Sequence, residues 1–149
     1  MKLLLKACLV ALFGLGLLVQ AQDDTSIKLV LKNVGASAWQ VTALEGAEGM
    51  VELIADNPEI SLTVGMRYVF DVSAVNSQVH PFEFRDAEDN VLLAQGDKAG
   101  SLEEDTDIAF ESDDEHLAFT LTPALAETLS YYRCTVHGGM TGTLIIISE

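Results

Sequence analysis

Four side chains of this sequence offer the donor atoms of a soft metal site, and three of them lie close together near the end of the chain. Cys134, His137 and Met140 form a Cys-x-x-His-x-x-Met motif, and His80 stands far upstream. Two imidazoles and a thiolate with a weak axial thioether are the ligands of a blue-copper electron-transfer site. A structural zinc site more often uses cysteine and histidine without methionine. The set therefore predicts one mononuclear copper ion that cycles between Cu(II) and Cu(I).

Each of these residues also has an ordinary structural explanation. A lone histidine such as His80 can be a core residue, Met140 can fill a gap in the core, and Gly138 and Gly139 can simply make a turn. We prefer copper because the spacing, the strand context and the cysteine count agree with one another.

The first 21 residues predict a secretory signal peptide. Lys2 and Lys6 flank the start of an apolar run from Ala7 to Val19, which is too short for a membrane span, and cleavage is expected after Ala21. Residues 22–149 then form one exported domain, periplasmic or extracellular, without a membrane span.

The cysteine count follows from this leader. Cys8 leaves with the signal peptide, so Cys134 is the single cysteine of the exported chain and an internal disulfide is impossible. A lone thiol in an oxidising compartment is explained by metal ligation, because a bound thiolate is protected.

Short β-strands must position these ligands, because apolar runs alternate with turn residues and no long helical period occurs. His80 is in phase with the apolar Phe82 and Phe84, whereas Glu83 and Arg85 take the opposite face. The pattern predicts an all-β Greek-key sandwich, with one possible helical turn at 123–128. The expected strands are Ile27–Lys32, Ala38–Ala43, Val51–Ala55, Ile60–Val64, Tyr68–Ala74, Phe82–Arg85, Val91–Gln95, Asp107–Glu111, Leu117–Thr122, Leu129–Cys134 and Thr143–Ile147.

Two stretches, Val79–Phe84 and Tyr132–Thr143, resemble the cupredoxins, the plastocyanin-like blue copper proteins. The short spacing from histidine to methionine is similar to that of amicyanin. The resemblance implies a Greek-key sandwich or barrel of about 7–9 strands. It also implies the ligand roles: His80 as the first ligand, Cys134 as the thiolate, His137 as the histidine at the solvent edge and Met140 as the axial ligand.

The residue after the first histidine departs from the family pattern. Small cupredoxins often have asparagine there, and its N–H points at the thiolate sulfur; Pro81 has no N–H, so that bond cannot form. Multicopper oxidases add histidines on the same strand, but here those positions are Glu83 and Arg85, which excludes an oxygen-reducing oxidase. A binuclear copper centre needs two cysteines and is excluded as well.

The net charge of −15 argues against nucleic acid or anionic lipid as a partner. A monomeric carrier would meet a redox protein, such as a basic cytochrome, at two candidate surfaces. One is an apolar rim of Pro81, Val136, Gly138 and Gly139; the other is the acidic stretch 103–115, with Glu103, Glu104 and Asp105 as the docking acids. Solvation alone is the simpler explanation of the acidic run.

No nucleophile–base pair or general base is evident, so we do not expect an enzyme. The alternative to electron transfer is copper storage, delivery or sensing, although only Met140 lies near the motif whereas metal-exchange sites are rich in methionine or histidine. The third histidine, His116, lies among acids and is left outside the site.

Overall fold

The computed structural model describes residues 25–96 and 99–148. This part of the chain contains ten strands and one short helix, and no helix in it is long and apolar enough to cross a membrane. The strands are β1 (Ser26–Val34), β2 (Ala38–Glu45), β3 (Ile60–Thr63), β4 (Arg67–Asp71), β5 (Phe82–Arg85), β6 (Val91–Ala94), β7 (Glu111–Ser112), β8 (His116–Thr120), β9 (Tyr131–Cys134) and β10 (Thr141–Ile147), with helix α1 (Pro123–Ala126) between β8 and β9.

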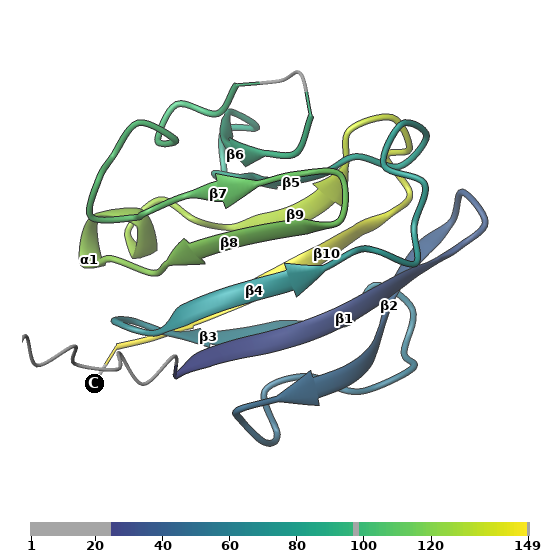
Figure 1. Ribbon diagram of the computed structural model, residues 1–149, viewed down its shortest axis with the longest axis horizontal. Helices are drawn as coiled ribbons and strands as arrows, with labels where there is room; N and C mark the ends of the chain where they lie inside the picture. Colours follow the sequence, from purple (N-terminus) through teal and green to yellow (C-terminus); the bar gives the residue numbers. More distant parts are fainter. Residues whose placement is uncertain (1–24, 97–98, 149) are drawn as a thin grey trace, which may run out of the picture.

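The strands form two five-stranded sheets, in the orders β2-β1-β4-β8-β7 and β3-β10-β9-β5-β6. Most neighbours are antiparallel, but β1 pairs with β4 and β3 with β10 in parallel, since the chain crosses repeatedly between the sheets (Figure 1). The expected all-β sandwich is therefore confirmed, with ten strands where about 7–9 were expected. The β1–β2 hairpin, the β4–β5 connection and the β9–β10 loop all lie at the right-hand end of Figure 1.

An aromatic core joins the two sheets. Phe70 on β4 meets Phe82 and Phe84 on β5, with ring centroids 5.6 and 4.9 Å apart, and Phe84 meets Phe119 on β8 at 5.0 Å. All four rings are fully buried. Phe82 and Phe84 alternate along β5 as the sequence pattern predicts, so burial of this apolar face fixes the register of the strand that follows His80.

Two of the expected strands are replaced by irregular backbone. Of Val51–Ala55 only Val51 makes a β-bridge, with Ile60, and Ile54 has a positive φ of 65°. The expected strand Asp107–Glu111 is mostly turn, because Ala109 has a φ of 48°, and β7 begins only at Glu111. A left-handed residue ends regular strand geometry, and no alternation of apolar residues reveals it. The expected helical turn is present as α1, capped by the Thr122 hydroxyl, which accepts from the Leu125 N–H at 3.2 Å.

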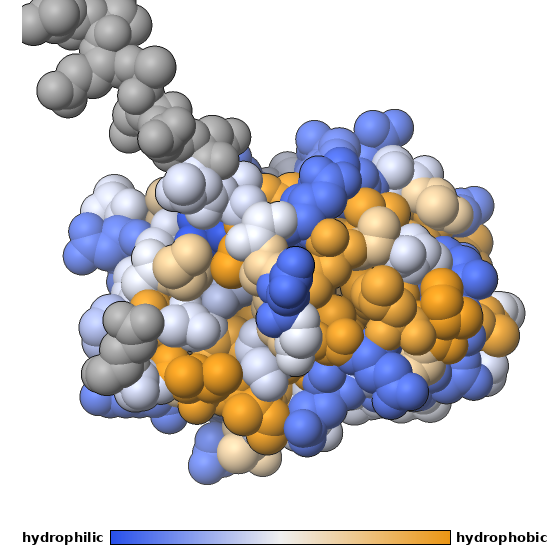
Figure 2. Space-filling model, turned by 90° about the horizontal axis from the view of Figure 1, so that it is seen from below, coloured by the Kyte–Doolittle hydropathy of each residue, from blue (hydrophilic) through white to orange (hydrophobic). Residues whose placement is uncertain are grey.

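Several large apolar side chains are exposed on the surface. Figure 2, viewed from below, shows a face on which apolar side chains gather between charged margins. The exposed large apolar residues are Val34, Leu53, Ile54, Val79, Val136, Ile145 and Ile147. Val79 and Val136 are among them and directly precede the candidate ligands His80 and His137 in the chain.

Candidate metal centre

Antiparallel pairing of β5 with β9 brings the upstream histidine to the cysteine. Phe82 lies opposite Cys134 in the register, so His80, two residues before Phe82, reaches the end of β9. His80 ends a turn in which its N–H donates to the Asn76 carbonyl at 2.8 Å. His137 and Met140 follow in the loop between β9 and β10. One strand pair and one hairpin thus assemble residues that are 54 positions apart.

The donor atoms converge on one point. Cys134 Sγ lies 3.9 Å from His80 Nδ1 and 3.6 Å from His137 Nδ1, and all three donors lie within 4.8 Å of one another. No other group of three or more His, Cys, Asp or Glu side chains converges in this way among residues 25–96 and 99–148. Cys134 is fully buried and His80 is 8% exposed, whereas His137 is half-buried. A thiolate and two imidazoles at these separations can hold one copper ion between them.

This arrangement of donors fits a type 1 copper site.

No protein-family model matches the chain, and no curated protein matches it. Solved structures of rusticyanin, a copper protein, do match. A methionine-to-glutamine mutant of rusticyanin covers 82% of this chain and 76% of its own, with 13% identity and a TM-score of 0.42. Rusticyanin from Thiobacillus ferrooxidans has the same coverage, 14% identity and a TM-score of 0.41. Identities and TM-scores this low do not support assigning a function. The copper site is therefore inferred from the geometry of its own residues.

The fourth expected ligand, Met140, is positioned by backbone hydrogen bonds within the loop. Its N–H donates to the His137 carbonyl at 3.0 Å, and its carbonyl accepts from the Cys134 N–H at 2.9 Å. Its side chain is fully buried and belongs to the same apolar cluster as Cys134. These bonds hold the Met140 backbone beside that of Cys134.

The Cys134 sulfur accepts a backbone hydrogen bond from the ligand loop, although Pro81 has no N–H to donate to it. The His137 N–H donates to Cys134 Sγ at 3.4 Å, and Pro81 uses its carbonyl to accept from the Thr135 N–H at 2.9 Å. The sequence alone showed which donor was missing but not which one replaces it. Such a bond withdraws charge from a thiolate and thereby tunes a metal that it binds.

Burial favours the metal-binding form of the first histidine. Desolvation, and secondarily the neighbouring His137, lowers the pKa of His80 below its ordinary value of 6.5. The imidazole therefore stays neutral at neutral pH, and a neutral imidazole is the form that ligates a metal.

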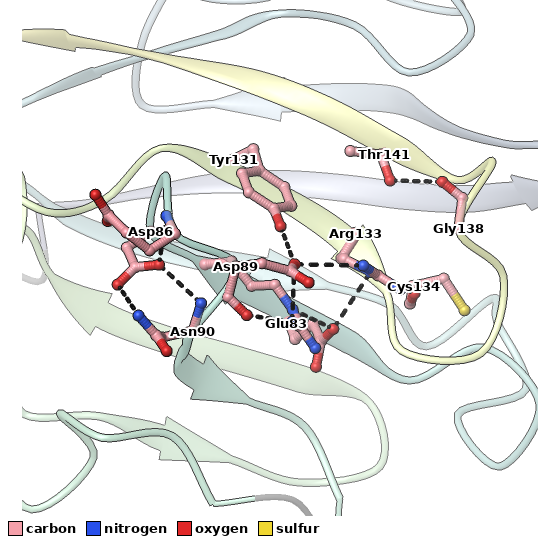
Figure 3. A network of polar contacts seen from close by, with 11 residues as sticks. Glu83, Asp86, Asp89, Asn90, Tyr131, Arg133, Cys134, Gly138 and Thr141 are labelled. Atoms are coloured by element: carbon pink, nitrogen blue, oxygen red, sulfur yellow. Dashed lines mark hydrogen bonds and ion pairs between the residues drawn. The ribbon is translucent and has the colours of Figure 1, made fainter.

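A charged network covers the outer face of β5 and β9 beside the cysteine (Figure 3). Glu83 is fully buried and accepts from Arg85 Nε at 2.7 Å, with Arg133 Nε at 3.4 Å. Arg133 Nε also lies 3.3 Å from the Cys134 carbonyl, and Asp89 pairs with both arginines. The sequence places Glu83 on the face of β5 that points away from the phenylalanine core. It does not reveal that Glu83 is fully buried there and pairs with two arginines.

Gln95 is a supporting residue that the sequence analysis did not identify. Its side-chain oxygen accepts from the Phe82 N–H at 3.1 Å, and its amide donates to the Asp113 carbonyl at 2.9 Å. The residue is 2% exposed. The sequence could have indicated it, because Gln95 lies on the same face of the expected strand as the buried Leu93. A polar side chain on a core face must find hydrogen-bond partners.

The expected docking residues fall into two groups. Val136 is 60% exposed, Gly138 and Gly139 are exposed, and Pro81 is half-buried; each of the four is a chain neighbour of a candidate ligand. The acidic set behaves differently, because the Glu103 carboxylate accepts the N–H groups of Ala94 and Gly100 at 2.8 and 2.7 Å and so braces a loop.

The remaining acids of this stretch stay exposed. Glu104 and Asp105 are on the surface, and Asp114 accepts from Ser77 Oγ at 3.3 Å, next to the turn that ends at His80. His116 lies apart from the metal centre, beside Asp71 and Asp113 at 3.9 and 3.4 Å. Its exclusion from the ligand set agrees with this placement.

Proposed function

We propose that this protein is an exported copper protein that carries single electrons between redox partners. The observation that carries the proposal is the convergence of one buried thiol and two imidazoles, with one imidazole reaching toward the surface. When bound, copper supplies a one-electron couple between Cu(II) and Cu(I).

Each of the four ligands would have its own role in such a site. Cys134 and His80 lie in the buried end of the sandwich, where apolar neighbours exclude water and bulk solvent cannot reorganise. Metal binding deprotonates a coordinating thiol, so Cys134 would supply the charge that holds Cu(II). Met140, on the buried side, would serve as the axial ligand. His137 lies among exposed glycines and would give electrons their shortest way to a partner.

The donor set also argues against catalysis. A catalytic metal site keeps an open coordination position for water or substrate, whereas His80, Cys134, His137 and Met140 would close this one with protein ligands. We therefore propose a carrier and not an enzyme. We also propose an exported location, because of the predicted leader; that leader, residues 1–21, lies outside the described residues.

Copper loading of the metal-free protein tests this function. We expect one Cu(II) per chain and an intense visible thiolate-to-copper absorption that makes the protein blue, with a reversible one-electron wave in voltammetry. His116→Asn is the matched control, because it removes a histidine outside the centre and should leave colour and stoichiometry unchanged. A colourless one-to-one complex would contradict electron transfer and favour copper storage, delivery or sensing.

For the partner, we propose a basic redox protein such as a cytochrome, which meets the apolar rim while the acidic surface attracts it. An acidic surface raises the association rate of a basic partner, whereas the rim lies next to His137 and offers the short electron path. The rim and the acids should therefore respond differently to salt.

Gly138→Trp should slow electron transfer about tenfold or more at every salt concentration, because the bulky side chain separates the partner from His137. Gly138→Ala is the control, since an added Cβ at Gly138 meets nothing within 4 Å. Replacing Glu104 and Asp105 by Gln and Asn should slow association at low salt only, and the difference should fade as the Debye length falls to about 8 Å. Glu103 is left unchanged, because its carboxylate braces the backbone.

Stopped-flow reduction by a basic cytochrome across a salt series measures both effects. Transfer by Gly138→Trp at the wild-type rate would show that the rim is not the point of electron entry.

A further inference from the structure

The outer part of the ligand loop has few packing contacts of its own. Between His137 and Met140 stand two exposed glycines, and an added Cβ would meet nothing within 4 Å at Gly138 and only the Ser37 carbonyl, at 3.8 Å, at Gly139. Glycine loses more conformational freedom on folding than any other residue. A loop with two consecutive glycines therefore needs an external contact to hold its ligands in one place.

The Asn57 side chain supplies such a contact from 82 positions away in the chain. Its Nδ2 donates to the Gly139 carbonyl at 3.0 Å and lies 3.4 Å from the Ser37 carbonyl. At the start of β10, the Thr141 hydroxyl donates to the Gly138 carbonyl at 2.8 Å (Figure 3). The Thr135 N–H ties the other end of the loop to Pro81. Among the described residues, Asn57 is the one side chain from a distant part of the sequence that hydrogen-bonds this glycine pair, because Thr141 directly follows the loop.

Asn57 itself is fixed to the core. Its N–H donates to the Trp39 carbonyl at 2.8 Å, and its Oδ1 accepts from the Trp39 N–H at 2.9 Å. Trp39 is fully buried and packs edge-on against Phe82, at 5.0 Å between ring centroids, and Phe82 is the register partner of Cys134. The φ of Asn57 is 49°, in a left-handed region that asparagine tolerates better than most residues.

We propose that Asn57 is a positioning residue for the copper centre: it holds the Gly138–Gly139 backbone against β2 and thereby sets where His137 and Met140 stand relative to Cys134. The inference rests on the proposed function for its copper readout, but the loop contact itself exists in the metal-free protein.

Two variants remove the contact; Asn57→Asp removes only the donor, and Asn57→Gly also removes the acceptor for the Trp39 N–H. Asn57→Asp keeps the size and the acceptor for the Trp39 N–H, but it turns an oxygen toward the Gly139 carbonyl in place of the donor. Asn57→Gly removes the side chain without strain at the positive φ. The control is Asn33→Asp, which adds the same charge at an asparagine whose amide donates to Gly35 in the β1–β2 hairpin and does not touch the ligand loop.

Hydrogen exchange of the metal-free proteins is the first measurement. We expect the hydrogen-bonded amides of His137 and Met140 in this loop to exchange about tenfold faster in both Asn57 variants, since one loop hydrogen bond is lost, while the Asn33 control exchanges like the wild type. The second measurement is the visible absorption maximum of the copper-loaded proteins, which should shift in both Asn57 variants and not in the control.

Unchanged exchange at residues 137–140 would overturn the proposal. So would equal acceleration at core amides such as that of Phe70, which would show general destabilisation, or a wild-type absorption maximum in both Asn57 variants. If the wild-type protein itself forms no blue complex, the copper carrier fails, and the exchange measurement alone then decides whether Asn57 positions the loop.

Discussion

Replacing Cys134 by serine should abolish the blue absorption and the one-electron couple while leaving the sandwich folded. The Sγ atom is the common neighbour of both imidazoles, at 3.9 and 3.6 Å, and a serine hydroxyl cannot give the thiolate bond from which the colour arises. The remaining donors, His80 and His137, would bind Cu(II) more weakly and without the intense band.

The fold should survive because the core does not depend on the metal. Cys134 is one member of a large apolar cluster whose aromatic residues lie on both sheets. A buried hydroxyl costs about 1–3 kcal/mol when its hydrogen bonding is incomplete, which is less than the stability of an ordinary domain.

Absorption spectra, voltammetry and circular dichroism of the metal-free variant measure the three parts of this expectation. Thr143→Ser on the adjacent strand is the control, because Thr143 is exposed and lies opposite Tyr131, three residues before Cys134. A random-coil dichroism spectrum would show that the thiol is needed for folding. A retained blue band would show that Cys134 is not the copper thiolate.

Replacing Gly142 by alanine should lower the free energy of unfolding by about 3 kcal/mol, the upper end of the usual cost of overpacking. An added Cβ would lie 2.1 Å from the Tyr132 hydroxyl oxygen and 2.2 Å from the ring carbon that bears it. The ring cannot move aside easily. It is fully buried, it stacks on Phe82 at 5.4 Å, and its hydroxyl donates to the Pro58 carbonyl at 2.6 Å.

Urea unfolding followed by tryptophan fluorescence measures this loss, since Trp39 is the single tryptophan and is fully buried. Gly138→Ala is the matched control four residues earlier, where the Cβ meets open space, and its effect should stay within about 0.5 kcal/mol. Equal stability of Gly142→Ala and the wild type would mean that Tyr132 does not cover Gly142 in solution.

Parts of the architecture were predictable because their causes are local. Alternation of apolar and polar residues has a period of two in a strand, so the core-facing row of Phe82 and Phe84 could be read directly. The segments 51–55 and 107–111 were not predictable, because positive φ angles at Ile54 and Ala109 break the strands. Those angles are set by contacts with distant backbone; the Ile54 N–H, for example, donates to the Val41 carbonyl.

The same division applies to the metal centre. The sequence by itself determined the donor chemistry, because the Cys134, His137 and Met140 side chains sit on one tight loop whatever surrounds it. Only the tertiary structure decided which partners complete the site: the register that brings His80 to Cys134, and the Asn57 amide that contacts the loop. Donor type is a property of single side chains, whereas hydrogen bonds between segments up to 82 residues apart depend on how the two sheets pack.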